Sequence, residues 1–75
     1  MPSHYTILEI SKDATPDQIR KAISAQLVKA GQMAETYHPR EVIKRFEQLA
    51  EAYRVLEDPL ERGAYEVKLL FSNII

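Results

Sequence analysis

The sequence contains no cysteine among its 75 residues. This absence excludes a disulfide framework, a thiolate metal site and cysteine catalysis. It also fits a reducing environment, so we expect the chain to reside in the cytoplasm or in another reducing, stroma-like compartment. A chain of this length is expected to form one small domain, whose single core is only marginally sufficient.

An excess of positive charge and a long apolar run are missing too. Ten Lys and Arg residues against eleven Asp and Glu residues give a net charge of -1, so no nucleic-acid partner is expected. The runs "TILEI" and "LLFSNII" are too short for a signal-peptide core or a membrane span, and we expect no membrane insertion by this segment. Alternating strand patterns are also lacking.

The C-terminal residues of the sequence are rich in apolar side chains. We expect residues 1–75 to be a single domain cut from a longer protein, because they close on a tail from Leu69 to Ile75 that is rich in apolar residues. Such a tail can pack on another segment or self-associate.

Helix start and stop signals are frequent, and the clearest start is "TPDQI". Thr15 is a predicted N-cap, a proline follows at the first helical position, and Gln18 can close a capping box. Apolar residues then recur at intervals of three and four, with Gln26 as a polar intrusion. Gly31 is a candidate left-handed stop, so this helix is predicted over about 16–30.

A second long helix is predicted over about 39–57, where apolar residues alternate at intervals of four and three. Pro39 suits its first turn, and Asp58 followed by proline ends it. Shorter helices are predicted over about 4–9 and 59–71. The sequence therefore predicts an all-α fold, in which an antiparallel hairpin of the two long helices is flanked by two shorter ones.

The predicted core consists of the apolar and aromatic residues on the inner faces of these helices, since their helical spacing favours packing over base stacking. These residues are Tyr5, Leu8, Ile19, Ile23, Leu27, Phe46, Leu49, Tyr53, Leu56 and Tyr65.

Two stretches resemble a known family. "HYTILEISKDATPDQIRKA" is similar to the first helix, linker and second-helix opening of the J-domain, the DnaJ-like co-chaperone module. "RFEQLAEAYRVLEDPLERGAYE" is similar to its third helix and the Asp-Pro-x-x-Arg-x-x-Tyr-acid segment that follows. The resemblance covers residues 4 to about 66. It implies stimulation of ATP hydrolysis by the seventy-kilodalton heat-shock chaperone, through a His-Pro-Asp loop after the second helix and a basic face on that helix.

The sequence departs from the family at this signature. Counting from Ile19, the triplet at the expected position is Gly31-Gln32-Met33. The lookalike His38-Pro39-Arg40 begins seven residues later and carries a base in place of the acid, which would repel a partner group arranged for a carboxylate. The chain is thus predicted to be a degenerate J-like member that does not stimulate the chaperone ATPase.

His38 also has the chemistry of a metal ligand or a general base. A metal site would need carboxylates, because no cysteine is present and the other histidine, His4, is distant in sequence. A general base would need a substrate pocket. The simpler prediction is that His38 lies next to the N-cap of the helix that Pro39 begins, so we expect no metal, no cofactor and no catalytic residue.

A protein partner is the expected ligand. The candidate interaction surface comprises the outer face of the 16–30 helix and the following residues, with a basic character thinned at Ser24, although these charges could also be an ordinary solvated surface. Its members are Arg20, Lys21, Ser24, Lys29, Gly31, Gln32 and Met33.

Three functional hypotheses remain from the sequence. The first is a non-catalytic interaction or scaffolding module with a J-domain fold. The second is a regulatory J-like subunit that pairs with an active J-protein. The third is a residual co-chaperone that uses His38-Pro39-Arg40 in a reshaped loop. An enzyme is not expected, because no nucleophile–base pair, phosphate loop or metal cluster is present in the sequence.

Overall fold

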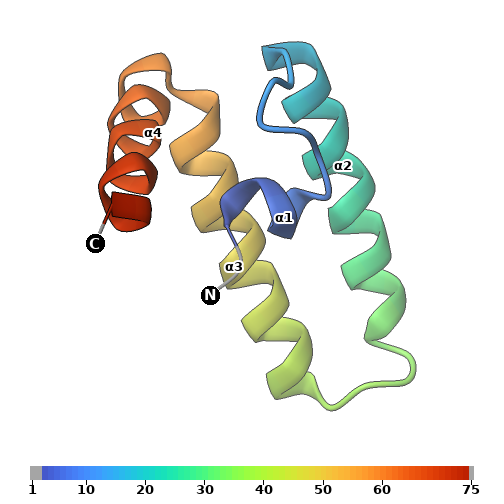
Figure 1. Ribbon diagram of the computed structural model, residues 1–75. Helices are drawn as coiled ribbons and strands as arrows, with labels where there is room; N and C mark the ends of the chain where they lie inside the picture. The colour runs from blue at the N-terminus through green and yellow to red at the C-terminus, as the bar shows by residue number, and fades with distance from the viewer. Residues whose placement is uncertain (1–2, 75) are drawn as a thin grey trace.

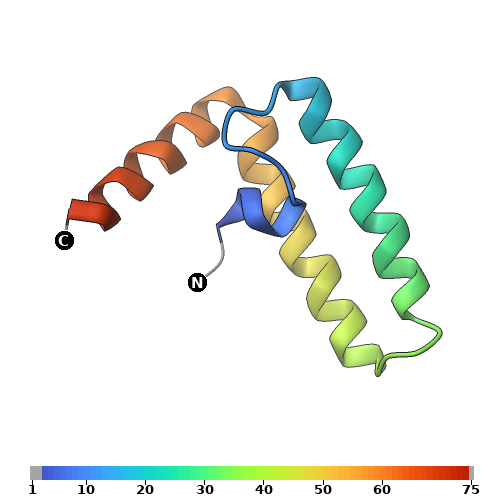
Figure 2. The ribbon, with the colours of Figure 1, turned by 45° about the vertical axis from the view of Figure 1, so that its right-hand side comes forward.

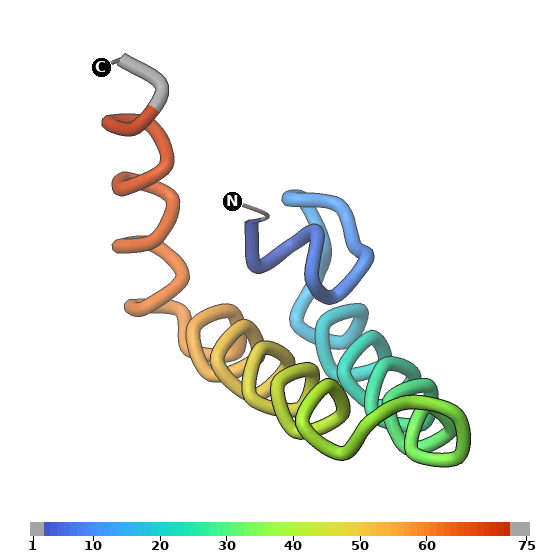
Figure 3. The backbone as a smooth tube through the Cα atoms, turned by 90° about the horizontal axis from the view of Figure 1, so that it is seen from below, coloured from blue at the N-terminus to red at the C-terminus, as the bar shows by residue number. Residues whose placement is uncertain are grey.

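The computed structural model describes residues 3–74, which form four helices joined by short links (Figure 1). The helices are α1 (His4–Leu8), α2 (Pro16–Met33), α3 (Pro39–Glu57) and α4 (Pro59–Ile74). No strand occurs within this range. α2 and α3 form an antiparallel hairpin, α1 lies across one face of it, and α4 points away from it (Figures 2 and 3). The predicted all-α hairpin is confirmed.

The start of α2 is as predicted, but its end is not. The Gln18 N–H donates to the Thr15 hydroxyl at 3.2 Å, and the Thr15 N–H donates to the Gln18 side chain at 2.9 Å, which completes the capping box. The predicted stop at Gly31 is wrong, because no described glycine has a positive φ. α2 runs on to Met33 and ends at Ala34, whose backbone stays right-handed at φ -59° and ψ -21°.

The other boundaries follow local chemistry. The prediction of α1 over 4–9 was one residue too long, because Glu9 takes the left-handed conformation at φ 58° and ends the helix. α3 has the predicted bounds, and Asp58 is extended before Pro59, as a residue before proline prefers. α4 extends beyond the predicted 71 to Ile74, and Ser72 does not interrupt it, since its hydroxyl donates to the Lys68 carbonyl one turn earlier at 3.0 Å.

The core lies where α1 covers the hairpin. Five predicted core residues are buried, namely Tyr5, Leu8, Ile19, Leu49 and Leu56. Three more pack against this cluster while half-buried, namely Ile23, Tyr53 and Tyr65.

The core prediction was wrong for Leu27 and Phe46, which are 42% and 38% exposed. The molecule measures 40 × 29 × 17 Å, so it is thin in one direction. α1 covers only one face of the hairpin (Figure 3). Apolar residues at the uncovered edge of α2 and α3 therefore remain in contact with solvent.

Candidate protein-interaction surface

The residues at the expected signature position form the last turn of α2. Gly31 and Gln32 are exposed and Met33 is half-buried, and all three have helical backbone. The Ala34 N–H donates to the Gly31 carbonyl at 3.2 Å, and the Tyr37 N–H donates to the Met33 carbonyl at 2.8 Å. The triplet is therefore part of a helix, and it presents no carboxylate.

His38 and Pro39 begin α3. His38 is itself the N-cap, and its Nδ1 accepts a hydrogen bond from the Arg40 N–H at 3.1 Å. Pro39 occupies the first helical turn, where an N–H would have no partner within the helix. The lookalike triplet thus has a local structural role at the start of α3, and its three side chains are exposed.

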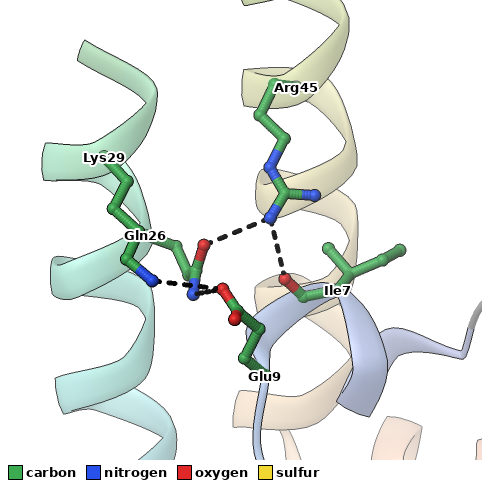
Figure 4. A network of polar contacts seen from close by, with 5 residues as sticks. All are labelled: Ile7, Glu9, Gln26, Lys29 and Arg45. Atoms are coloured by element: carbon green, nitrogen blue, oxygen red, sulfur yellow. Dashed lines mark hydrogen bonds and ion pairs between the residues drawn. The ribbon is translucent and has the colours of Figure 1, made fainter. Parts of the chain in front are cut away.

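The predicted cations of α2 do not form one patch. Arg20 forms an ion pair with Asp17 one turn earlier, and the Ser24 hydroxyl donates to the Arg20 carbonyl at 3.2 Å. Lys21 is exposed. Lys29 lies on the flank that faces α1, where its Nζ is 3.4 Å from a carboxylate oxygen of Glu9 (Figure 4). The structure therefore groups Arg20 with Ser24 and separates both from Lys29.

An apolar groove runs between α2 and α3. Its volume is about 420 Å³, and all of its lining residues come from these two helices: Arg20, Ile23, Ser24, Leu27, Ala50 and Tyr53. Arg20 is the cationic residue among them. We refer to these six residues as the α2–α3 groove. A groove of this composition can accept apolar side chains of a protein partner.

The sequence did not predict this groove. Ile23, Leu27 and Tyr53 were assigned to the core, because helical periodicity identifies an apolar face but not whether another element covers it. The available signal was the width of the apolar stripe, since α2 and α3 carry more apolar residues than one seam between two helices can bury.

The opposite flank of the hairpin is fixed by a polar network (Figure 4). Gln26 is 4% exposed. Its amide N–H donates to the Glu9 carboxylate, and its carbonyl accepts from Arg45 at 3.1 Å. Arg45 also donates to the Ile7 carbonyl at 3.2 Å. Hydrogen bonds from Gln26 and Lys29 hold the pKa of Glu9 below its usual value.

The two remaining features of the described residues concern metal-ligating side chains and His4. No group of three metal-ligating side chains occurs among residues 3–74. The His4 ring stacks on Tyr65 at a centroid distance of 4.4 Å, and burial lowers the pKa of His4. No helix in the described range has the length and apolar character needed to cross a membrane.

The four helices together form a J-domain-like helical module. Its features are the antiparallel hairpin of α2 and α3, the short helix α1 laid across one face of it, and α4, which begins directly after the end of α3. The chain belongs to the DnaJ domain family, whose model matches residues 3–66.

Relatives within this family include full chaperones. The chain is 36% identical over 72 residues to the chaperone protein DnaJ of Protochlamydia amoebophila, an alignment that covers 88% of this chain and 17% of that protein. It is 38% identical over 69 residues to the chaperone protein DnaJ of Chlamydia abortus and 39% identical over 69 residues to that of Chlamydia trachomatis serovar D. Each of these two alignments covers 84% of this chain and 16% of the relative. The chain thus spans about a sixth of these relatives' length.

Proposed function

We propose that this J-domain is a non-catalytic protein-interaction module that does not stimulate the chaperone ATPase. One observation carries the proposal: the triplet at the signature position is Gly31-Gln32-Met33, which is the last turn of α2 and contains no carboxylate. The family's activity depends on an acid held in a rigid loop at this place. A reducing compartment, such as the cytoplasm, is the setting we propose for it.

The lookalike triplet offers no replacement for the lost signature. His38 caps α3 and Pro39 fills its first turn, so both are explained by the helix that they begin. Arg40 brings a positive charge where the family has a negative one, and such a mismatch weakens binding to a site built for an acid.

The surface proposed to bind a partner is the α2–α3 groove, with Arg20 at its rim. Leu27 contributes to this groove an apolar side chain that is 42% exposed. Exposed apolar surface of this kind favours a partner with an apolar helix or loop, and the single cation favours an acidic residue beside it.

A single-turnover ATPase assay tests the proposal. The reaction contains a bacterial seventy-kilodalton heat-shock chaperone and either this domain or the J-domain of the Chlamydia trachomatis relative as positive control. We expect the control to accelerate ATP hydrolysis and this domain to leave the rate unchanged. Acceleration by this domain that disappears on His38→Gln would instead support the residual co-chaperone.

A restored variant makes the assay specific for the signature. We would replace the triplet by Gly31→His, Gln32→Pro and Met33→Asp. If only the signature is missing, this variant gains stimulation that the native domain lacks. If it stays inactive while remaining folded, the rest of the surface has diverged as well, which also favours a module with another partner.

The groove is tested by pull-down with the tagged domain as bait. Leu27→Asp places a charge in the groove and should abolish recovery of partners that the native domain retains. Lys29→Ala is the matched control, because Lys29 lies on the α1 flank. Equal recovery by the native domain and Leu27→Asp would contradict this surface.

A further inference from the structure

The outer face of α4 is apolar from its first turn almost to its last. Leu60, Val67, Leu70 and Phe71 are 85%, 51%, 63% and 61% exposed, and Ala64 between them is exposed too. We refer to these five residues as the α4 ridge. At 100° per residue they occupy one side of the helix, and no charged residue lies among them.

Two charged residues of α4, Arg62 and Glu66, lie on the side toward the domain, whereas Glu61 and Lys68 flank the ridge and are exposed. Arg62 donates to the Tyr5 hydroxyl at 3.2 Å and to the Lys12 carbonyl at 3.0 Å, and the Tyr5 hydroxyl donates to the Glu66 carboxylate. The Tyr65 hydroxyl accepts from the His4 N–H at 2.9 Å. These contacts fix the rotation of α4. Arg62 and Glu66 are therefore turned toward the domain, and the apolar ridge is turned toward solvent.

Only part of the predicted apolar tail belongs to this face. Leu69 packs against the core, whereas Leu70 and Phe71 point to solvent. The side chains of residues 73 and 74 and the whole of Ile75 lie outside the described part of the chain. The ridge thus begins earlier than the tail suggested by the sequence and includes Leu60.

The spacing of the ridge matches helix pairing. Leu60, Ala64, Val67 and Phe71 follow at intervals of four, three and four, which is the repeat of the a and d positions in a coiled coil. In an antiparallel pair, Leu60 of one copy faces Phe71 of the other, and Ala64 faces Val67. Each layer then combines a smaller with a larger side chain, whereas a parallel pair would place Ala64 against Ala64 and leave a void.

The charges beside the ridge also select the antiparallel pair. In this repeat Leu60 and Val67 take the d positions, so Glu61 and Lys68, which follow them directly, take the e positions. Both charged residues are exposed, and e positions face each other across an antiparallel pair. Two-fold symmetry would then form two Glu61–Lys68 ion pairs between the copies. In a parallel pair, Lys68 would instead face Gly63 of the other copy and find no opposite charge there.

We propose that the α4 ridge binds α4 of a second copy of this chain in antiparallel orientation. This surface is separate from the α2–α3 groove, so the inference does not depend on the proposed function. A lipid surface fits less well, because an interfacial helix needs a basic rim and the ridge is flanked by one anion and one cation. The dimer is weak, because so short a seam buries less than the roughly 1,200 Å² typical of stable interfaces.

Sedimentation equilibrium of the domain between about 10 μM and 1 mM tests the proposal. The native domain should change from monomer to dimer over this range. Phe71→Asp should remain monomeric throughout. Val28→Asp is the matched control, since Val28 is also 61% exposed but lies on α2, and it should dimerise like the native domain. Monomeric native domain at every concentration would overturn the proposal, whether or not it binds vesicles of neutral or anionic lipid.

Charge reversal tests the orientation. Glu61→Lys alone and Lys68→Glu alone each bring like charges together and should weaken the dimer by roughly three- to tenfold in Kd, and the double variant should restore it. Glu61 also lies near Arg54 of its own chain. If Glu61→Lys acted only by repelling Arg54 of its own chain, the double variant, which still carries lysine at position 61, would dimerise as weakly as the single variant. Absence of rescue would reject the antiparallel pair, and Glu47→Lys on α3 controls for the change in net charge.

Discussion

Gln26 illustrates what a single polar residue does in this core. It comes from α2, yet its amide contacts Glu9 at the end of α1 and Arg45 on α3 (Figure 4). Both ends of the amide are hydrogen-bonded although the residue is 4% exposed. A buried amide without such partners would cost about 1–3 kcal/mol. The position is therefore polar at little net cost, and it fixes how α1 sits on the hairpin.

Gln26→Ala should lower the free energy of unfolding by about 1–3 kcal/mol, because it leaves a void and removes both hydrogen bonds. Gln26→Leu fills the space, and Glu9 and Arg45 can turn to solvent, so it should cost less than about 1 kcal/mol. Urea unfolding followed by circular dichroism measures both values.

The control for this change is Gln48→Ala, because Gln48 is exposed on α3 and its replacement should alter stability by less than about 0.5 kcal/mol. A cost for Gln26→Leu as large as that for Gln26→Ala would show that the hydrogen bonds, and not the filled volume, dominate at this site.

At the scale of the helices, starts were more predictable than ends. Thr15 and Pro39 mark the starts of α2 and α3 because capping and the first turn depend on particular side chains. The end of α2 was placed too early at Gly31. A glycine permits a left-handed stop but does not require it, and the two residues that follow are adequate helix formers.

The helical conformation of the glycines gives a prediction. Gly31 and Gly63 both lie inside helices, neither has a positive φ, and a Cβ atom added at either would meet nothing within 4 Å. Gly31→Ala and Gly63→Ala should therefore each stabilise the domain by about 0.5–1 kcal/mol. Thermal unfolding would show a higher Tm for each variant.

Whether Gly31→Ala raises or lowers the stability distinguishes an α2 that continues to Met33 from one that ends at Gly31. If Gly31 were the left-handed stop that its sequence context suggests, alanine would be strained there and would destabilise the domain. Gly63→Ala serves as the reference, because position 63 is interior to α4 in both cases. A stabilising Gly63→Ala with a destabilising Gly31→Ala would place the end of α2 at residue 31.

For the whole molecule, the sequence predicted the helical faces but not which of them another element covers. Leu27 and Leu49 have the same apolar character, yet the first is 42% exposed and the second fully buried, because α1 covers one side of the hairpin only. Likewise, no local pattern shows that Arg45 bonds to Ile7, a contact that spans 38 residues. The groove and the ridge both result from this incomplete coverage.

The attachment of α4 gives the last prediction. Arg62 joins α4 to α1 through the Tyr5 hydroxyl and to the following link through the Lys12 carbonyl, and its guanidinium lies 5.5 Å from the Tyr5 ring centre. Arg62→Ala removes these contacts. We expect the amides of α4 to exchange with deuterium roughly 10- to 100-fold faster, while those of α2 and α3 keep their protection.

The matched control is Arg20→Ala, because the Arg20 side chain pairs with Asp17 on its own helix, α2, and both side chains are exposed. That pair contributes little, so protection of α4 should stay close to native. Uniformly faster exchange in all helices of the Arg62→Ala variant would instead show that the domain unfolds as one unit. Release of α4 alone would show that the polar side of this helix, and not its apolar ridge, holds it on the domain, which leaves the ridge available for a second copy.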